Sequence, residues 1–174
     1  YVLLLRGINV GGKMVKMARL KQILEDLGYQ NVVTLLNSGN VIIETDKQNS
    51  KTIRAEIENN LEDTFGFPVR TILLTHAAIT ALVFSDPFKG IPITKDTRLY
   101  ITFLSEKPTS KLKVPYTSED RSFCILSVTN SEIHSVLDLS RGKGTTDAMN
   151  ILEKEFGKQI TTRNWNTVQK IAVS

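Results

Sequence analysis

The amino-acid sequence predicts an α+β protein made of two tandem units, each with the βαββαβ order of a ferredoxin-like domain. Short apolar runs alternate with segments whose apolar residues recur every three or four positions, in the order β-α-β-β-α-β. A similar order returns after a proline-containing linker. Residues 61–71 also align with residues 152–162 at an offset of 91, with Leu, Glu, Phe, Gly and Thr in common. These observations favour an internal duplication with a degraded second half.

The first half carries all the elements of one unit. Gly28 and Gly66 each follow a helical pattern, where a C-terminal glycine is favoured. The tetrapeptide 37–40, Asn-Ser-Gly-Asn, is typical of a tight turn between two strands. The expected elements are a strand over 1–8, a helix over 17–27, a hairpin over 32–45, a helix over 53–65, a strand over 69–74 and a short helix over 76–84.

The second half is expected to lack one helix. Pro108 and Pro115 interrupt the segment between Leu104 and Arg121, so the helix due there is shortened or lost. The predicted domains are residues 1–85, a linker over 86–97, and residues 98–174. The expected elements are a strand over 98–104, a hairpin over 123–139, a helix over 146–156, a strand over 158–162 and a terminal helix over 164–172.

Composition restricts the classes of function. The chain has 174 residues, 41% of them apolar, and its longest apolar run is too short to span a membrane, so no membrane partner is expected. A single Cys fits a cytoplasmic location, and with two distant His it leaves too few ligands for a zinc site. The net charge of +4 permits contact with phosphates. Nucleic acid is disfavoured as a partner, because the central strands offer aliphatic rather than aromatic residues.

Three segments resemble a known family. Residues 4–13, LLRGINVGGK, are similar to the start of the bacterial domain-of-unknown-function family 1697. Residues 37–41, NSGNV, and 161–168, TTRNWNTV, resemble that family's second and third hallmark segments. Met14-Val15-Lys16 and Leu36 depart from the residues that many relatives carry there. The resemblance implies a cytoplasmic bacterial α+β protein and supplies no activity.

The first candidate site is the glycine-rich loop that follows the first strand. Glycines between a strand and a helix let backbone N–H groups point at an anion, and basic side chains add charge. The spacing matches neither a dinucleotide fingerprint nor a P-loop, and a loop that simply needs positive φ angles is the alternative. The residues predicted to bind here are Arg6, Gly7, Asn9, Gly11, Gly12 and Lys13.

Two further segments are candidates in the second half. Arg141 and Lys143 lie between a strand and a helix, where they could hold an anion or form an ordinary solvated helix start. Arg163 and Asn164 precede the only Trp, Trp165. Arg163 could bind a carboxylate or phosphate, or pair with an acid such as Glu155, whereas Trp165 is expected to anchor the core and Asn164 to cap the last helix.

The positions of these loops follow if strands 1 and 3 of each unit run parallel. In that arrangement the loop over 6–13 and the hairpin turn over 37–40 lie at opposite edges of the sheet. Arg141 and Lys143 are likewise expected to lie apart from Arg163. No nucleophile and base are identifiable, so catalytic residues, cofactors and oligomeric state are not predicted. The leading hypothesis is that this uncharacterised protein binds a small anionic ligand that carries phosphate. The alternatives are a non-catalytic protein-interaction module and an enzyme acting on a phosphorylated metabolite.

Overall fold

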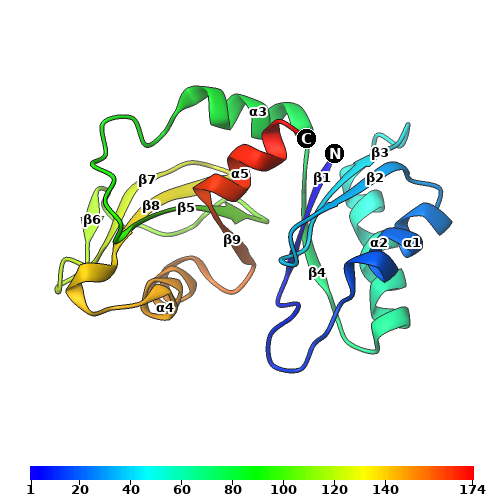
Figure 1. Cartoon of the computed structure of the whole chain (residues 1–174), viewed down its shortest axis with the longest axis horizontal. Coiled ribbons are helices and arrows are strands. Elements are labelled where there is room, and N and C mark those ends of the chain that lie inside the picture. The colour runs from blue at the N-terminus through cyan, green and yellow to red at the C-terminus, as the bar shows by residue number, and fades with distance from the viewer. The chain divides into compact units, whose positions relative to one another are not determined.

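The computed structural model describes residues 1–174, which form two compact units (Figure 1). The first unit comprises Tyr1–Ala81 and Ile171–Ser174, and the second comprises Leu82–Lys170. Each unit contains its own antiparallel sheet, so the mixed α+β class expected from the sequence is confirmed. The sequence-based boundaries of the domains stay a prediction. None of the helices combines the length and apolar character needed to cross a bilayer.

The first unit follows the expected order of elements closely. Its four strands form a sheet in the order β2-β3-β1-β4, with every neighbouring pair antiparallel. Helix α2 begins after the capping side chain of Asn49 and ends at Gly66, which adopts a φ of 75°. The elements are β1 (Val2–Arg6), α1 (Met17–Asp26), β2 (Gln30–Leu35), β3 (Asn40–Glu44), α2 (Ser50–Phe65), β4 (Arg70–Leu74) and α3 (His76–Ser85).

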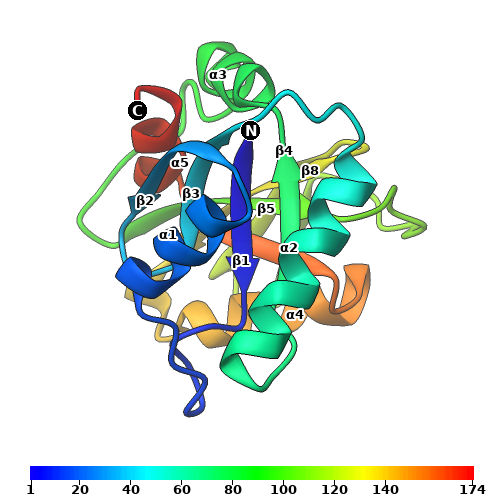
Figure 2. The ribbon, with the colours of Figure 1, turned by 90° about the vertical axis from the view of Figure 1, so that its right-hand side faces the viewer.

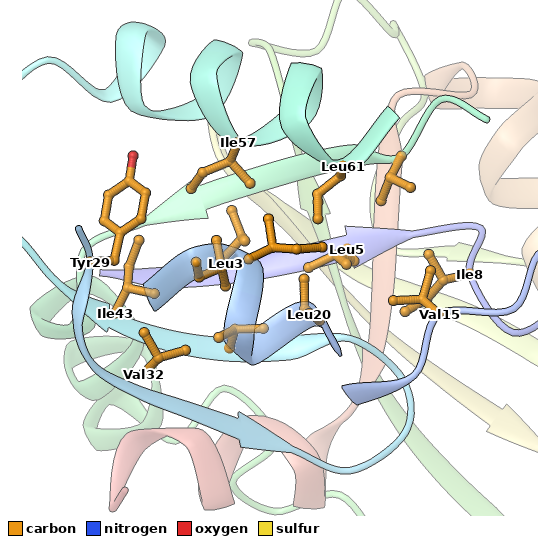
Figure 3. Packing of buried hydrophobic residues seen from close by; sticks show 14 of the residues in the cluster. Leu3, Leu5, Ile8, Val15, Leu20, Tyr29, Val32, Ile43, Ile57 and Leu61 are labelled. Carbon is orange, nitrogen blue, oxygen red and sulfur yellow. The ribbon is translucent and has the colours of Figure 1, made fainter. Parts of the chain in front are cut away.

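Helices α1 and α2 cover one face of this sheet (Figure 2). Alternate residues of each strand point at these helices, and on β1 the residues of the other face, Val2 and Leu4, are buried as well. Leu3 and Leu5 of β1 meet Leu20 of α1 and the α2 residues Ile57 and Leu61 in one buried cluster (Figure 3). This core holds both ends of the loop that joins β1 to α1.

The second unit is built around a five-stranded sheet in the order β6-β7-β8-β5-β9. No helix lies between β5 and β7, as expected for a segment interrupted by two prolines. The two-residue strand β6 was not expected from the sequence. The elements are β5 (Thr97–Leu104), β6 (Tyr116–Thr117), β7 (Phe123–Val128), β8 (Glu132–Asp138), the 3₁₀ turn η1 (Leu139–Arg141), α4 (Thr145–Phe156), β9 (Ile160–Asn164) and α5 (Trp165–Ala172).

The expectation about opposite sheet edges is wrong. Strand β1 runs antiparallel to β3, with Leu4 opposite Asn40, so the end of β1 meets the turn between β2 and β3. The error came from treating strands 1 and 3 as parallel, whereas a crossover connection makes strands 1 and 2 parallel and places strand 3 between them. The same correction applies to the second unit. Strands β8 and β9 are both antiparallel to β5, so they end at the same edge of the sheet.

Candidate functional site

The loop after β1 is a short projecting hairpin, which we call the tongue and define as residues 9–14. All six residues are exposed, whereas the flanking Ile8 and Val15 are buried in the core of the first unit. Figure 3 shows these two side chains next to each other at one end of that core. In Figure 2 the tongue extends beyond the lower edge of the sheet. The tongue is therefore an exposed loop with two anchored ends.

A Gly-Gly turn forms the tip of the tongue. The Lys13 amide donates to the Val10 carbonyl oxygen at 3.1 Å. Gly11 and Gly12, the two residues between them, have φ angles of 56° and 82°. Positive φ at both central positions is the pattern of a type I′ turn, which glycine adopts without strain. The glycines predicted here are thus required by the backbone, as the alternative interpretation of this loop held.

Asn9 connects the tongue to the rest of the first unit. Its side-chain oxygen accepts from the Val15 amide at 2.9 Å. Its side-chain nitrogen donates to the carbonyl oxygens of Asn37, at 2.7 Å, and Val15, at 3.3 Å. Asn9 itself has a φ of 56°, which Asn tolerates better than most residues. One amide side chain therefore joins the tongue, the start of α1 and the β2–β3 turn.

The β2–β3 turn packs closely against the end of β1. The Leu5 amide donates to the Gly39 carbonyl oxygen at 2.8 Å. A Cβ atom added to Gly39 would lie 2.6 Å from Cδ1 of Ile8 and 2.7 Å from Cβ of Leu5. Asn40, which is fully buried, donates to the Leu35 carbonyl oxygen at 2.9 Å. The structure thus brings together the two family-like segments that the sequence argument had separated.

Several backbone N–H groups of the tongue have no acceptor in the protein. The amides of Asn9 and Lys13 are used by bonds within the tongue, and the Val15 amide by the side chain of Asn9. The amides of Val10, Gly11 and Gly12 donate to no other residue. Three consecutive exposed N–H groups at a glycine turn can donate hydrogen bonds to an anion or to water.

Helix α1 begins without a capping side chain. Lys16 stands at the N-cap position and makes no side-chain hydrogen bond to the helix, and the first turn holds no acidic residue. The amides of Met17, Ala18 and Arg19 precede the first intrahelical bond, which runs from Leu20 to Lys16. The positive end of the helix dipole is therefore not neutralised by a side chain of this protein.

Three cations accompany these donors. Lys13, Lys16 and Arg19 form no ion pair, although the Lys13 ammonium lies 5.9 Å from the centre of the Phe67 ring. Residues 1–24 contain five basic side chains and no acidic one, and the β2–β3 hairpin over 32–43 has no charge. The remaining 150 residues carry 17 basic and 18 acidic side chains. The positive excess of the chain thus resides in this segment.

The second candidate loop has acidic partners of its own. The Arg141 Nε atom lies 3.2 Å from a carboxylate oxygen of Asp138, and the Gly144 amide donates to the Asp147 carboxylate at 3.1 Å. The Ser118 hydroxyl, followed by the Ser122 amide and hydroxyl, lowers the pKa of Asp120 to about 2, and the charge of Lys143 contributes. An anion would have to compete with carboxylates already at this helix start.

The third candidate segment is embedded in the second unit. Arg163 lies within β9, opposite Ile101, and burial lowers the pKa of its guanidinium group to about 10. Glu155, the acid suggested as its partner, accepts a hydrogen bond from the Ser110 hydroxyl. Trp165 is 6% exposed, and its ring centre lies 5.3 Å from that of Phe88, as expected of a core anchor.

The last helix begins with the predicted cap. The Asn164 side-chain oxygen accepts from the Asn166 amide at 3.0 Å. Because this oxygen already serves the helix, Asn164 has a structural reason to occupy this position. That Arg163 and Asn164 bind a ligand stays a prediction.

The structure also assembles a cluster that sequence analysis missed. The Ser127 hydroxyl lies 2.8 Å from Nδ1 of His134, and Nε2 of the same ring lies 3.9 Å from the Glu132 carboxylate. Ser127 and His134 face each other because the β7–β8 register shifts after Ile125, a bulge that the sequence pattern does not reveal. His134 is only 9% exposed, with the Phe88 ring beside it, whereas Ser127 and Glu132 are partly exposed.

The other features of the first unit do not extend the site. A cavity of about 560 Å³ lies at the opposite edge of its sheet, lined by Tyr1, Gly28, Gln30, Glu44, Thr45, Asp46 and Lys47. None of these is a predicted site residue. No group of three or more His, Cys, Asp or Glu side chains is placed to hold a metal ion.

The chain is thus an α+β protein of two units, whose first unit carries a cationic, glycine-tipped loop beside a tight hairpin turn. The chain belongs to the family described as "Protein of unknown function (DUF1697)", whose model matches residues 1–131. A solved structure of similar fold is that of the conserved bacterial protein SP0830 from Streptococcus pneumoniae, with 23% identity and a TM-score of 0.74. That similarity covers 99% of this chain and 96% of the other. Among curated proteins, none matches.

Proposed function

We propose that this protein binds a small anionic, phosphate-bearing ligand at the tongue and the start of α1. The observation that carries the proposal is the set of unsatisfied donors there. The amides of Val10, Gly11 and Gly12 have no acceptor, and the first turn of α1 has no cap. The other helix starts are each served by a side chain, namely Asn49 at α2, Thr75 at α3, Asp147 at α4 and Asn164 at α5. An oxyanion is the partner that complements such donors.

The charges support the same ligand class. Lys13, Lys16 and Arg19 are exposed or partly exposed and lack carboxylate partners, so binding an anion would not require breaking an ion pair. Arg141 and Lys143, by contrast, have acidic neighbours. The tongue is therefore the preferred site and the second loop the weaker one.

The two sheets of the protein have corresponding strand orders. Both sheets contain four strands in the same relative order, β2-β3-β1-β4 in one unit and β7-β8-β5-β9 in the other. This correspondence supports tandem ferredoxin-like units that arose by duplication, with the second lacking one helix. A cytoplasmic location, as the single part-buried Cys124 favours, would supply phosphorylated metabolites.

Titration calorimetry of the full chain with inorganic pyrophosphate tests the proposal. We expect binding that weakens at high salt and that falls by about tenfold in the double variant Lys13→Gln/Lys16→Gln. The matched control, Lys111→Gln/Lys113→Gln, removes two exposed cations from the second unit and should bind as the wild type does. No heat of binding, or equal loss in both double variants, would contradict a site at the tongue.

A further inference from the structure

The tip of the tongue exposes apolar side chains that phosphate binding does not require. Val10 and Met14, on either side of the Gly-Gly turn, are 61% and 69% exposed. Leu36 is 51% exposed in the adjacent β2–β3 turn and has a φ of 58°. A left-handed conformation is unfavourable for a branched aliphatic residue, and here it coincides with an exposed position. These residues form an apolar tip beside the cationic segment.

The kind of side chain restricts the partner. All three residues are aliphatic, whereas single-stranded nucleic acids are bound by aromatic rings that stack on bases. The tongue also projects beyond the edge of the sheet (Figure 2). A projecting apolar tip is suited to inserting into the acyl-chain region of a lipid bilayer.

The surrounding charge selects one kind of bilayer. Lys13 lies within the tip, Lys16 and Arg19 follow it, and residues 1–24 contain no acidic side chain. A bilayer that contains anionic lipids presents acyl chains for the tip and phosphate groups for the cations and free amides. We propose that the tongue docks this protein peripherally on an anionic lipid surface, with headgroup phosphates as the ligands of the proposed site.

This inference rests on the proposed function and narrows its ligand to lipid headgroups. It involves contact with the bilayer surface only. The short apolar runs of the sequence argue against a spanning segment and leave peripheral docking open. Three cations and a small apolar tip give weak, reversible binding to such a surface.

Co-sedimentation of the full chain with vesicles tests the inference. The vesicles are pure phosphatidylcholine, or phosphatidylcholine with about one third phosphatidylglycerol, a typical anionic content for such assays. We expect the protein to sediment with the anionic vesicles only and to be released by salt. The variant Val10→Ser/Met14→Ser should reduce the bound fraction by about tenfold, because it removes most of the apolar tip.

The control variant is Ile93→Ser/Val114→Ser, which replaces two exposed apolar residues of the second unit and should leave vesicle binding unchanged. Equal binding to neutral vesicles, or full binding by Val10→Ser/Met14→Ser, would overturn the lipid assignment. Absence of vesicle binding with pyrophosphate binding intact would also overturn it and would leave the proposed function standing. Absence of both would contradict the proposed function as well.

Discussion

At the scale of single residues, Asn9 determines how the tongue is held. Its side chain makes three hydrogen bonds, to both backbone groups of Val15 and to the Asn37 carbonyl oxygen. No shorter or apolar side chain reproduces this pattern. The positions of the donors at the tip therefore depend on a residue that need not contact a ligand.

We expect Asn9→Ala to lower the free energy of unfolding by about 1 to 3 kcal/mol, because it leaves backbone groups unpaired and places Ala at a positive φ. The loss should appear in urea denaturation, and faster hydrogen exchange of the Val15 amide should accompany it. Asn60→Ala, which removes one bond to the Glu56 carbonyl oxygen inside α2, is the control and should change stability by much less. Equal effects of the two substitutions would contradict the role given to Asn9.

Two glycines of the site are expected to respond differently to the same substitution. Gly39→Ala places a Cβ atom against Leu5 and Ile8 at a φ of 71°, so we expect a loss of about 2 to 4 kcal/mol. Gly12→Ala meets open space at a φ of 82°, and only the backbone cost of about 1 kcal/mol applies. Thermal and urea unfolding of both variants measure the difference. Comparable losses would mean that the β2–β3 turn is not packed as described.

The buried imidazole of His134 links stability to pH. Burial lowers its pKa below the ordinary value of 6.5, and the charge of Glu132 opposes this only in part. The folded state therefore favours the neutral ring, so its contribution to stability is present above pH 6.5 and is lost as the pH falls below that value. We expect the free energy of unfolding to decline between neutral and mildly acidic pH, and to decline less in His134→Gln. A steeper decline in the variant would show that the sign is wrong.

At the scale of elements, helix α1 lacks a capping side chain at its N-terminus, which leaves backbone N–H groups available for the proposed ligand. Lys16 occupies the N-cap position with extended φ and ψ angles, a conformation that Ser also adopts at helix starts. A Ser side chain at this position is therefore expected to stabilise the helix and to weaken binding of the proposed ligand.

We expect Lys16→Ser to raise the free energy of unfolding by about 0.5 to 2 kcal/mol and to weaken pyrophosphate binding. The reason is that a capping hydroxyl satisfies one of the amides proposed to meet the ligand, while a cation is lost. Asn49→Ala, which removes the cap of α2, should lower stability by about 1 kcal/mol and leave binding unchanged. Urea denaturation and calorimetry on both variants give the comparison, and tighter binding by Lys16→Ser would contradict the site.

The elements themselves were largely predictable from the sequence, because apolar periodicity and terminal glycines mark their ends. The helix over 17–27 and the hairpin over 32–45 correspond to α1 and to β2 and β3. The strand over 158–162 lies two residues further along, at Ile160–Asn164, since its polar residues obscure the alternation. The two-residue strand β6 has no sequence signal of its own and exists through pairing with β7.

The relation between the motifs was not predictable in the same way. Whether the tongue meets the β2–β3 turn depends on strand direction, and the assumed direction was wrong. The bond between Asn9 and Asn37 spans 28 residues, so no local pattern indicates it. The carboxylate near Lys143 was likewise not identified, because Asp120 reaches it only through the fold of the second unit.

At the scale of the molecule, the charge is uneven in a way that composition conceals. A net charge of +4 is unremarkable for 174 residues, yet residues 1–24 carry five cations and no anion. The rest of the chain is almost neutral. An anionic partner is therefore expected to approach one segment of the first unit rather than the surface at large.

Titration of the isotope-labelled full chain with inorganic pyrophosphate, followed by amide chemical shifts, would locate the anion site. We expect saturable shifts at the amides of Val10, Gly11 and Gly12 and in the first turn of α1, with none at the start of α4. Shifts confined to residues 140–146, or an unchanged spectrum at saturating pyrophosphate, would contradict this expectation.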